Sequence, residues 1–276
     1  MQKFLTDIHT HSTFSFDGVD ELQDMLCSAQ RKGVAFYGVS EHFDYDLLVR
    51  GNRTGRRMID EAEYFHRARH LQEDYQGVMN VLIGAEFSYI KDEKALALYL
   101  EVVEKYKPDF IVNSLHSING EDYSGKKLFY NDAGQLRTKA EVYKEYLDAI
   151  YDSLSAPYPY DIVGHIGYAT RYAPYTDKTL YYTEFAEEID RILTEIIRRN
   201  KILEINSSMK DALSITPLDI FKRYFALGGR LISIASDAHD ANRICDKRAE
   251  LVSALKAIGF THCHVPDRQE YIPLEL

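Results

Sequence analysis

The chain has 276 residues, 45% of them hydrophobic, and a formal net charge of −10 at pH 7. The length is typical of one α/β barrel, and the hydrophobic content is that of a soluble globular protein. The acidic balance without a basic stripe argues against a nucleic-acid binder, and no apolar run approaches the ~20 residues that a membrane span needs. We therefore expect one domain over residues 1–276, with neither nucleic-acid nor membrane partners.

The cysteines and the N-terminal sequence indicate the compartment. Cys27, Cys245 and Cys263 form no CxxC pair and are odd in number, which favours reduced thiols. Asp7 and His9 follow the first residue almost at once, so no signal peptide fits before them. A cytoplasmic protein is therefore expected.

Short apolar runs alternate with helical stretches along the chain. Strands rich in Val, Ile, Leu and Phe are predicted near residues 4–9, 35–41, 81–87, 109–115, 160–165, 202–206 and 231–236. Helices are predicted near residues 20–32, 59–75, 94–106, 139–154, 183–199, 217–227 and 247–258. These repeats favour a parallel barrel, incomplete or distorted, and a doubly wound sheet is the alternative. Residues 261–265 are a candidate for a short closing strand.

Three of the predicted loops after strands are long, at residues 43–58, 117–138 and 167–182. In a barrel these loops would lie over the catalytic face and define substrate choice. Ten of the 21 tyrosines fall between Tyr143 and Tyr182. We expect them mainly to pack helices and loops, and the alternative is an aromatic wall beside the substrate.

Six of the seven predicted strands have, at or next to their C-terminal ends, residue types that can bind metal ions. The candidate ligands are His9, His11, Asp17, His42, Glu86, His116, His165, Asp237 and His239. Alternation along a strand places His9 and His11 on the same side, and Asp7 is expected to orient a histidine ring. The C-terminal ends of parallel barrel strands converge on one face, so the set predicts a multi-metal site there.

Other motifs are expected to be unrelated to this site. His66 and His70 have a spacing that can bind zinc, but their helix is charged and we expect solvated side chains. His262 and His264 lie far from the predicted strand ends. Residues 120–127 resemble a phosphate-binding loop, but Lys127 occupies the Ser/Thr position. We reject a nucleotide site and keep the loop lysines as candidate phosphate contacts.

Taken together, the motifs resemble those of the polymerase and histidinol phosphatase (PHP) superfamily. The matching segments are Asp7-Ile-His9-Thr-His11, Ser40-Glu41-His42, Gly84-Ala85-Glu86, Ser114-Leu115-His116, Gly164-His165 and Ser236-Asp237-Ala238-His239. Chain length and motif spacing are similar to those of the stand-alone histidinol-phosphatase family. The resemblance covers residue 4 to about 245 and implies a distorted (β/α)7 TIM-like barrel with a trinuclear metal site at the C-terminal ends of the strands.

The resemblance also implies how the ligands are shared among three divalent ions. One ion would take His9, His11, Glu86 and Asp237. A second would share Glu86 as a bridging carboxylate and add His116 and His165, and the third would take Asp17, His42 and His239. Imidazole and carboxylate ligands suit zinc, manganese or iron.

The expected reaction is hydrolysis of a phosphomonoester, most specifically of L-histidinol phosphate to L-histidinol and phosphate in histidine biosynthesis. The nucleophile would be a hydroxide held by the metals, with Glu86, Asp237 and His42 acting as members of the metal site. Arg171 and Ser117, and more weakly Asn206, are the expected substrate contacts. Some relatives carry an Asp where this chain has Gly167, so the segment 167–172 is expected to hold the substrate differently.

Three alternatives stay open at this point. One is a related phosphoesterase that acts on another small phosphate, such as a nucleotide or a sugar phosphate. A second is an amidohydrolase-type hydrolase, although no lysine is placed to bridge metals by carboxylation. The third is a non-catalytic module, which is disfavoured because all nine ligand positions are filled.

Overall fold

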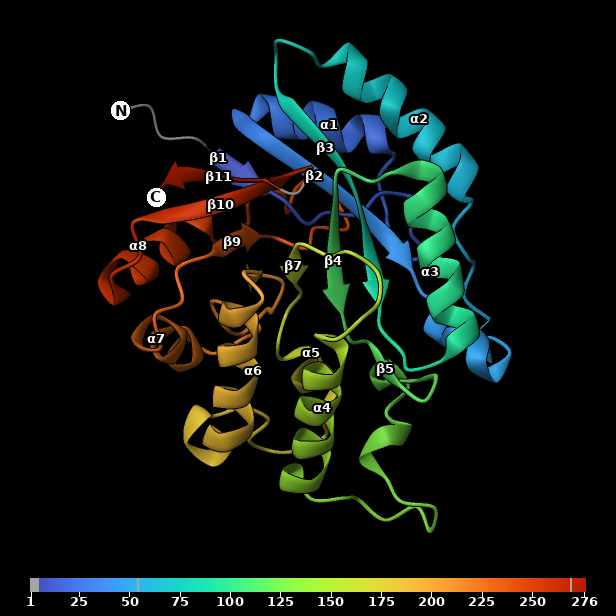
Figure 1. Cartoon of the computed structure of the whole chain (residues 1–276), viewed down its shortest axis with the longest axis vertical. Helices are drawn as coiled ribbons and strands as arrows, with labels where there is room; N and C mark the ends of the chain where they lie inside the picture. The colour runs from blue at the N-terminus through green and yellow to red at the C-terminus, as the bar shows by residue number, and fades with distance from the viewer. Residues whose placement is uncertain (1–4, 54, 269) are drawn as a thin grey trace.

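The computed structural model describes residues 5–53, 55–268 and 270–276. Seven strands form one sheet, in the order β1-β2-β3-β4-β7-β8-β9 (Figure 1). They are β1 (Leu5–Asp7), β2 (Val34–Phe43), β3 (Asn80–Ser88), β4 (Phe110–Ser114), β7 (Ile162–Val163), β8 (Ile202–Asn206) and β9 (Ile232–Ala235). All neighbouring pairs are parallel. Residue 4 of the first predicted strand and residue 54 of a predicted loop lie outside the described residues.

The first and last strands of the sheet approach each other just beyond their ends. Thr10 and Ala238 form an isolated parallel bridge. The His11 amide donates to the Ala238 carbonyl at 2.8 Å, and the Asp237 amide donates to the His9 carbonyl at 2.9 Å. The sheet is therefore a nearly closed barrel of seven parallel strands, and the doubly wound alternative is wrong.

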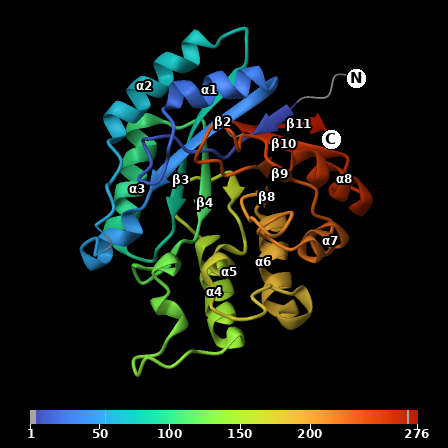
Figure 2. The same cartoon turned by 180° about the vertical axis from the view of Figure 1, so that it is seen from behind.

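Helices lie around the outside of the strands in both views (Figures 1 and 2). They are α1 (Leu22–Arg31), α2 (Glu61–Asp74), α3 (Glu93–Tyr106), α4 (Lys139–Ser153), α6 (Ala186–Arg198), α7 (Leu218–Ala226) and α8 (Arg248–Ile258). In α6, Ile189, Ile192, Leu193 and Ile196 follow the helical period and are buried. The N-terminus of α4 is fixed by a reciprocal capping box.

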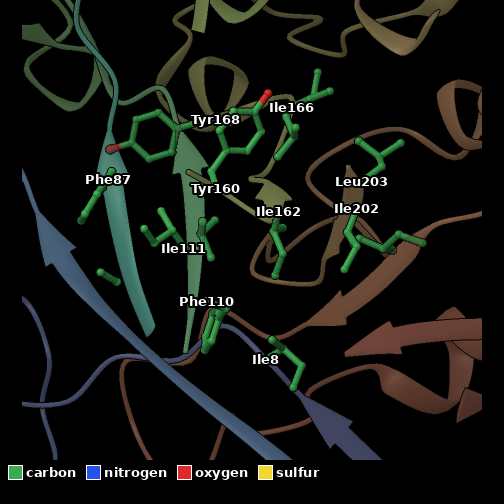
Figure 3. Packing of buried hydrophobic residues seen from close by; sticks show 14 of the residues in the cluster. Ile8, Phe87, Phe110, Ile111, Tyr160, Ile162, Ile166, Tyr168, Ile202 and Leu203 are labelled. Carbon is green, nitrogen blue, oxygen red and sulfur yellow. The ribbon is translucent and has the colours of Figure 1, made fainter. Parts of the chain in front are cut away.

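The core fills the space inside and around the strands because strands of this kind are apolar on both faces. Ile8, Phe110, Ile111, Ile162 and Ile202 are at most 3% exposed and converge there (Figure 3). A Cβ atom at Gly84 would overlap the Phe110 ring, which crosses the neighbouring strand at that point. The rigid core holds the strand ends, and any side chain attached to them, in fixed positions.

The three predicted long loops contain short elements of their own. The first holds η1 (Tyr45–Arg50), a 3-10 helix. The second holds a hairpin of β5 (Ser117–Ile118) and β6 (Glu121–Asp122), then η2 (Tyr123–Gly125) and η3 (Lys127–Phe129). The third holds α5 (Tyr168–Tyr172) and η4 (Tyr182–Glu184). Tyr143, Tyr146 and Tyr158 are buried, as expected for packing residues.

The predicted closing strand at residues 261–265 forms, but it does not close the barrel. It belongs to β10 (His262–Asp267), which pairs antiparallel with β11 (Glu270–Glu275) in a separate two-stranded sheet. The expectation is wrong because the backbone beyond β1 and β9 already joins the two edges. None of the helices in the described part of the chain has the length and apolar character that a membrane crossing requires.

Candidate metal centre

The nine candidate ligands come together at the C-terminal ends of the barrel strands. His42 and Glu86 lie within β2 and β3, and the other seven lie in the segments that follow β1, β4, β7 and β9. His9, His11 and Glu86 have no exposed surface. The fold thus brings residues from positions 9 to 239 into one cluster.

Glu86 lies at the centre of this cluster, and its two oxygens face different histidines. Oε1 is 2.8 Å from His165 Nε2 and 3.2 Å from His116 Nε2. Oε2 is 2.8 Å from His42 Nδ1 and 3.4 Å from His9 Nε2. A carboxylate in this position can act as a ligand for more than one cation.

Two further groups adjoin Glu86. His9 Nε2 and His11 Nε2 face each other at 3.1 Å, and Asp237 Oδ1 is 3.3 Å from the second nitrogen. In the other group, Asp17 Oδ1 is 3.6 Å from His42 Nε2 and 3.4 Å from His239 Nε2. The Asp17 side chain is 41% exposed, so this group is the most open to solvent.

The close packing of like and unlike charges shifts the pKa values of these groups. Burial alone would lower the pKa of His42, but the carboxylates of Glu86 and Asp44 outweigh it and raise the pKa to about 9. Burial, together with the neighbouring His42 and His239, lowers the pKa of His11 to about 3. Burial would raise the pKa of Glu86, yet the histidines around it hold that pKa well below its usual range.

The donor set fits divalent cations. Four groups of three residues place one ligand atom each within 4.8 Å of one another: His11, His42 and His239; His9, His11 and Asp237; His9, Glu86 and His165; His42, Glu86 and His116. Although Glu86 Oε2 and His42 Nδ1 are only 2.8 Å apart, neither atom makes a hydrogen bond within the described residues. Buried polar atoms without hydrogen bonds are rare, and a cation bound by Glu86 Oε2 would satisfy that oxygen.

Asp7 does not have the role that the sequence suggested. Its carboxylate accepts from the Ser236 amide at 2.9 Å, the Ser236 hydroxyl at 2.5 Å and the Cys245 amide at 2.7 Å. It therefore holds the backbone next to Asp237 rather than a histidine ring, and that expectation is wrong. One side chain that does contact a ligand ring is Glu204 of β8, whose Oε1 is 2.5 Å from His9 Nδ1.

Other buried carboxylates beside the cluster were also missed from the sequence. Glu41 accepts hydrogen bonds from the amides and hydroxyls of Ser12 and Ser15, which fixes the loop after β1. Asp44 Oδ1 is 3.4 Å from His116 Nδ1. The signal for these residues was available, because an acidic residue within or next to an apolar strand must find partners when it is buried.

A cavity of about 220 Å³ opens over the cluster. Besides ligand candidates, it is lined by two arginines, a carboxylate and three aromatic residues: Arg56, Arg171, Asp44, Phe16, Tyr168 and Tyr172. The Arg56 guanidinium lies 4.3 Å from the centre of the Phe16 ring and donates to Asp122 at 2.7 Å. Two of the tyrosines therefore do face the cavity, as the alternative interpretation held.

The three expected substrate contacts occupy different environments. Arg171 lines the cavity, and its Nη2 lies 3.3 Å from Asp237 Oδ2. Ser117 is buried outside the cavity lining and donates to Asp46. Asn206 is also buried, and it donates to Glu204 Oε2 at 3.2 Å. His70, which was set aside, is solvated as expected and pairs with Asp74. Lys127, which was kept as a candidate phosphate contact, is exposed, pairs with Glu121 and does not line the cavity.

Comparisons with known proteins agree with this fold. The sequence model of the PHP domain matches residues 7–208. The chain is 28% identical to a protein of Clostridium acetobutylicum named "Probable histidinol-phosphatase", over 84% of this chain and 86% of that protein. It is 28% identical to the histidinol-phosphatase of Lactococcus lactis subsp. lactis, over 92% of this chain and 91% of that protein. A crystal structure of histidinol phosphate phosphatase from Lactococcus lactis, complexed with zinc, L-histidinol and phosphate, superposes with a TM-score of 0.85 and 25% identity, over 97% of this chain and 98% of that one.

Proposed function

The chain belongs to the PHP domain family, and from this we propose that it is a metal-dependent phosphatase that hydrolyses L-histidinol phosphate to L-histidinol and phosphate. The observation that carries the proposal is the convergence of nine histidine and carboxylate side chains beneath a cavity with two arginines. The likeness to the L. lactis enzyme, which binds zinc, L-histidinol and phosphate, supports the same substrate here.

We assign three divalent ions to the cluster, as the motif resemblance implies. His9, His11, Glu86 and Asp237 would hold the first, supported by the 3.3 Å between His11 Nε2 and Asp237 Oδ1. The second would share Glu86, through the oxygen that faces His116 and His165. The third would take Asp17, His42 and His239, whose ligand atoms are at most 3.6 Å apart. When bound, such ions supply a Lewis acid for the phosphoryl oxygens and an activated water.

The protein's own groups bind and orient the phosphate. Arg171 provides a planar pair of N–H donors at the cavity wall, and its contact with Asp237 fixes that orientation. A phosphate dianion bound in the cavity would lose much of its hydration, so a nearby cation is needed to compensate its charge. Arg56, held by Asp122 and stacked over Phe16, adds positive charge on another side of the cavity.

The non-phosphate part of the substrate carries an imidazole and an amine. Phe16, Tyr168 and Tyr172 offer aromatic surface for the imidazole. The Asp44 carboxylate, also in the lining, offers a negative charge for the amine. We further propose that the enzyme is one domain, works in the cytoplasm and loads zinc, manganese or iron.

The test is phosphate release from L-histidinol phosphate, compared with a panel of nucleotide and sugar monophosphates. Each substrate is assayed with metal-depleted protein and after addition of zinc, manganese or iron. We expect activity only with metal, and the highest kcat/KM for L-histidinol phosphate. Metal-dependent activity confined to other esters would reject the substrate and keep the metal centre. If no ester is hydrolysed with any metal, the phosphatase assignment is wrong.

A further inference from the structure

Glu204 lies beside the metal centre and contacts residues that follow two different barrel strands. The residue lies in β8, in the apolar segment Ile202–Asn206, and its side chain has no exposed surface. Oε1 is 2.5 Å from His9 Nδ1, and Oε2 accepts from the backbone amide of His165 at 2.7 Å. These two histidines are 156 residues apart in sequence and follow β1 and β7.

The hydrogen-bond partners of Glu204 determine its chemical form. The amide of His165 can only donate, and the Asn206 side-chain amide donates to the same oxygen at 3.2 Å. An ionised carboxylate accepts all these bonds, and the remaining partner, His9 Nδ1, must then carry a hydrogen. The other ring nitrogen, Nε2, is left with its lone pair directed at His11 Nε2 and Glu86 Oε2, 3.1 and 3.4 Å away.

The two histidines that Glu204 holds belong to the two assigned ions that share Glu86, His9 to the first and His165 to the second. His9, Glu86 and His165 place their ligand atoms within 4.8 Å of one another. Partners that orient the ligands of a metal typically change its affinity by about 10–100-fold when they are removed. A single carboxylate that positions His9 and His165 therefore affects both of these ions.

We propose that Glu204 is a positioning residue that sets the tautomer of His9 and the location of His165, and thereby couples the two inner metal positions of the site. This inference rests on the proposed metal centre but not on the identity of the substrate. The same proposal gives Asn206 a function different from substrate binding, because its side-chain amide donates a hydrogen bond to the Glu204 carboxylate. The outer group of Asp17, His42 and His239 has no contact with Glu204 among the described residues.

The decisive variant is Glu204→Gln, which preserves shape but introduces an N–H donor. If the new amide nitrogen faces His165 and Asn206, three donors meet without an acceptor. If it faces His9, the ring must accept at Nδ1, and the hydrogen moves to Nε2, where a metal would bind. Neither orientation preserves the arrangement, whereas a residue that only fills space would tolerate the change.

The experiment measures zinc stoichiometry and affinity by graded competition with a chelator, without substrate. We expect Glu204→Gln to lose zinc from the inner positions about 10–100-fold more readily than the wild type, while the outer zinc is retained. In the 15N NMR spectrum of the zinc-loaded wild type, His9 Nδ1 should carry the hydrogen that Glu204 accepts, and zinc-loaded Glu204→Gln should lose this Nδ1–H signal. Asp161→Asn is the matched control, because Asp161 is a partly buried carboxylate at the opposite end of the barrel that accepts from the Ile111 amide at 3.0 Å.

Zinc binding by Glu204→Gln equal to that of the wild type would overturn the proposal. So would an equal loss of zinc in Asp161→Asn, because the effect would then follow general destabilisation. If Glu204→Gln does not fold, Glu204→Asp is measured in its place. This variant keeps a carboxylate, which only accepts hydrogen bonds, on a side chain that is one methylene shorter. We expect its inner zinc affinity to fall with the outer zinc retained, and wild-type affinity in this variant would also overturn the proposal. A protein that shows these zinc effects but hydrolyses no L-histidinol phosphate would reject the proposed substrate alone.

Discussion

His42 and Glu86 are register partners on neighbouring parallel strands, and their side chains meet with Nδ1 2.8 Å from Oε2. Side chains at the same level of adjacent strands project to the same side of the sheet, so this contact follows directly from the pairing of β2 with β3. The register therefore places the central carboxylate of the site, and a shift of one residue would turn it to the other face.

Replacement of Glu86 should disrupt the whole centre. Glu86→Ala removes a carboxylate that faces histidines from four segments, so we expect loss of bound metal and a decrease in kcat of more than about 100-fold. Metal content per chain and steady-state kinetics check this. Glu93→Ala, the same change on the exposed surface of α3, serves as the control. Full occupancy and activity in Glu86→Ala would show that Glu86 is not a shared ligand.

Arg171 should act mainly on substrate binding. Arg171→Ala removes a charged donor from the cavity wall, and we expect KM for the phosphate ester to rise by about 10–100-fold, with a smaller change in kcat. Arg171→Lys keeps the charge but not the paired donors, so its KM should lie between the KM of the wild type and that of Arg171→Ala. Arg243→Ala is the control, because Arg243 contacts the Ser208 carbonyl outside the cavity lining. Unchanged KM and kcat in Arg171→Ala would place this residue outside the substrate site.

The stability of the metal-free protein should depend on pH through His42. The pKa of this residue is raised from 6.5 to about 9, because Glu86 and Asp44 outweigh the effect of burial. A raised histidine pKa gives stability that is fully present below pH 6.5 and is lost as the pH rises through 9. With a chelator present, the free energy of unfolding should therefore decrease from pH 6.5 to 9.

Denaturant titrations at several pH values measure this change, and the His42→Gln variant is the comparison. The variant has no titrating imidazole at this position, so its stability should vary less across the same interval. A protein with metal bound should behave differently, because the metal competes with the proton for the ring nitrogens and binds more tightly as the pH rises. Equal pH dependence in the wild type and His42→Gln would contradict the assignment.

Addition of a single methyl group at Gly164 should reduce both stability and turnover. A Cβ atom at this position would overlap Ser114 Oγ, which donates to Glu86 Oε1 at 2.6 Å. We expect Gly164→Ala to destabilise the protein by about 1–3 kcal/mol and to lower turnover by about 10-fold through Glu86. Gly125→Ala is the control, since a Cβ there meets no atom within 4 Å, and its effect should stay within about 0.5 kcal/mol. Thermal unfolding and kcat distinguish the two variants.

The sequence predicted the barrel because each strand is a short apolar segment followed by a helical one. The predicted strand at 81–87 corresponds to β3 (Asn80–Ser88), whereas 160–165 is reduced to β7 (Ile162–Val163), because the backbone leaves regular pairing before His165. The candidate ligand histidines could be identified because they lie at the ends of these apolar segments. Their positions in one cluster are confirmed by the structure, while their role as ligands stays a prediction.

What the sequence did not indicate depends on contacts between distant segments. Glu204 meets His9 across 195 residues, and this partnership arises only from the near closure of the barrel. Asp7 was expected at a histidine ring because it is close in sequence, but the fold turns it to Ser236. Arg56 reaches the cavity from the loop after β2, and no local pattern distinguishes it from other loop arginines.

The bridge between Thr10 and Ala238 has a consequence for how the enzyme is made. His9 and His11 precede and follow the first of these residues, and Asp237 and His239 flank the second, so the two ends of the barrel complete the site together. During synthesis, the first pair leaves the ribosome long before the second. The nascent chain therefore cannot assemble the cluster around Glu86 until residue 239 has emerged.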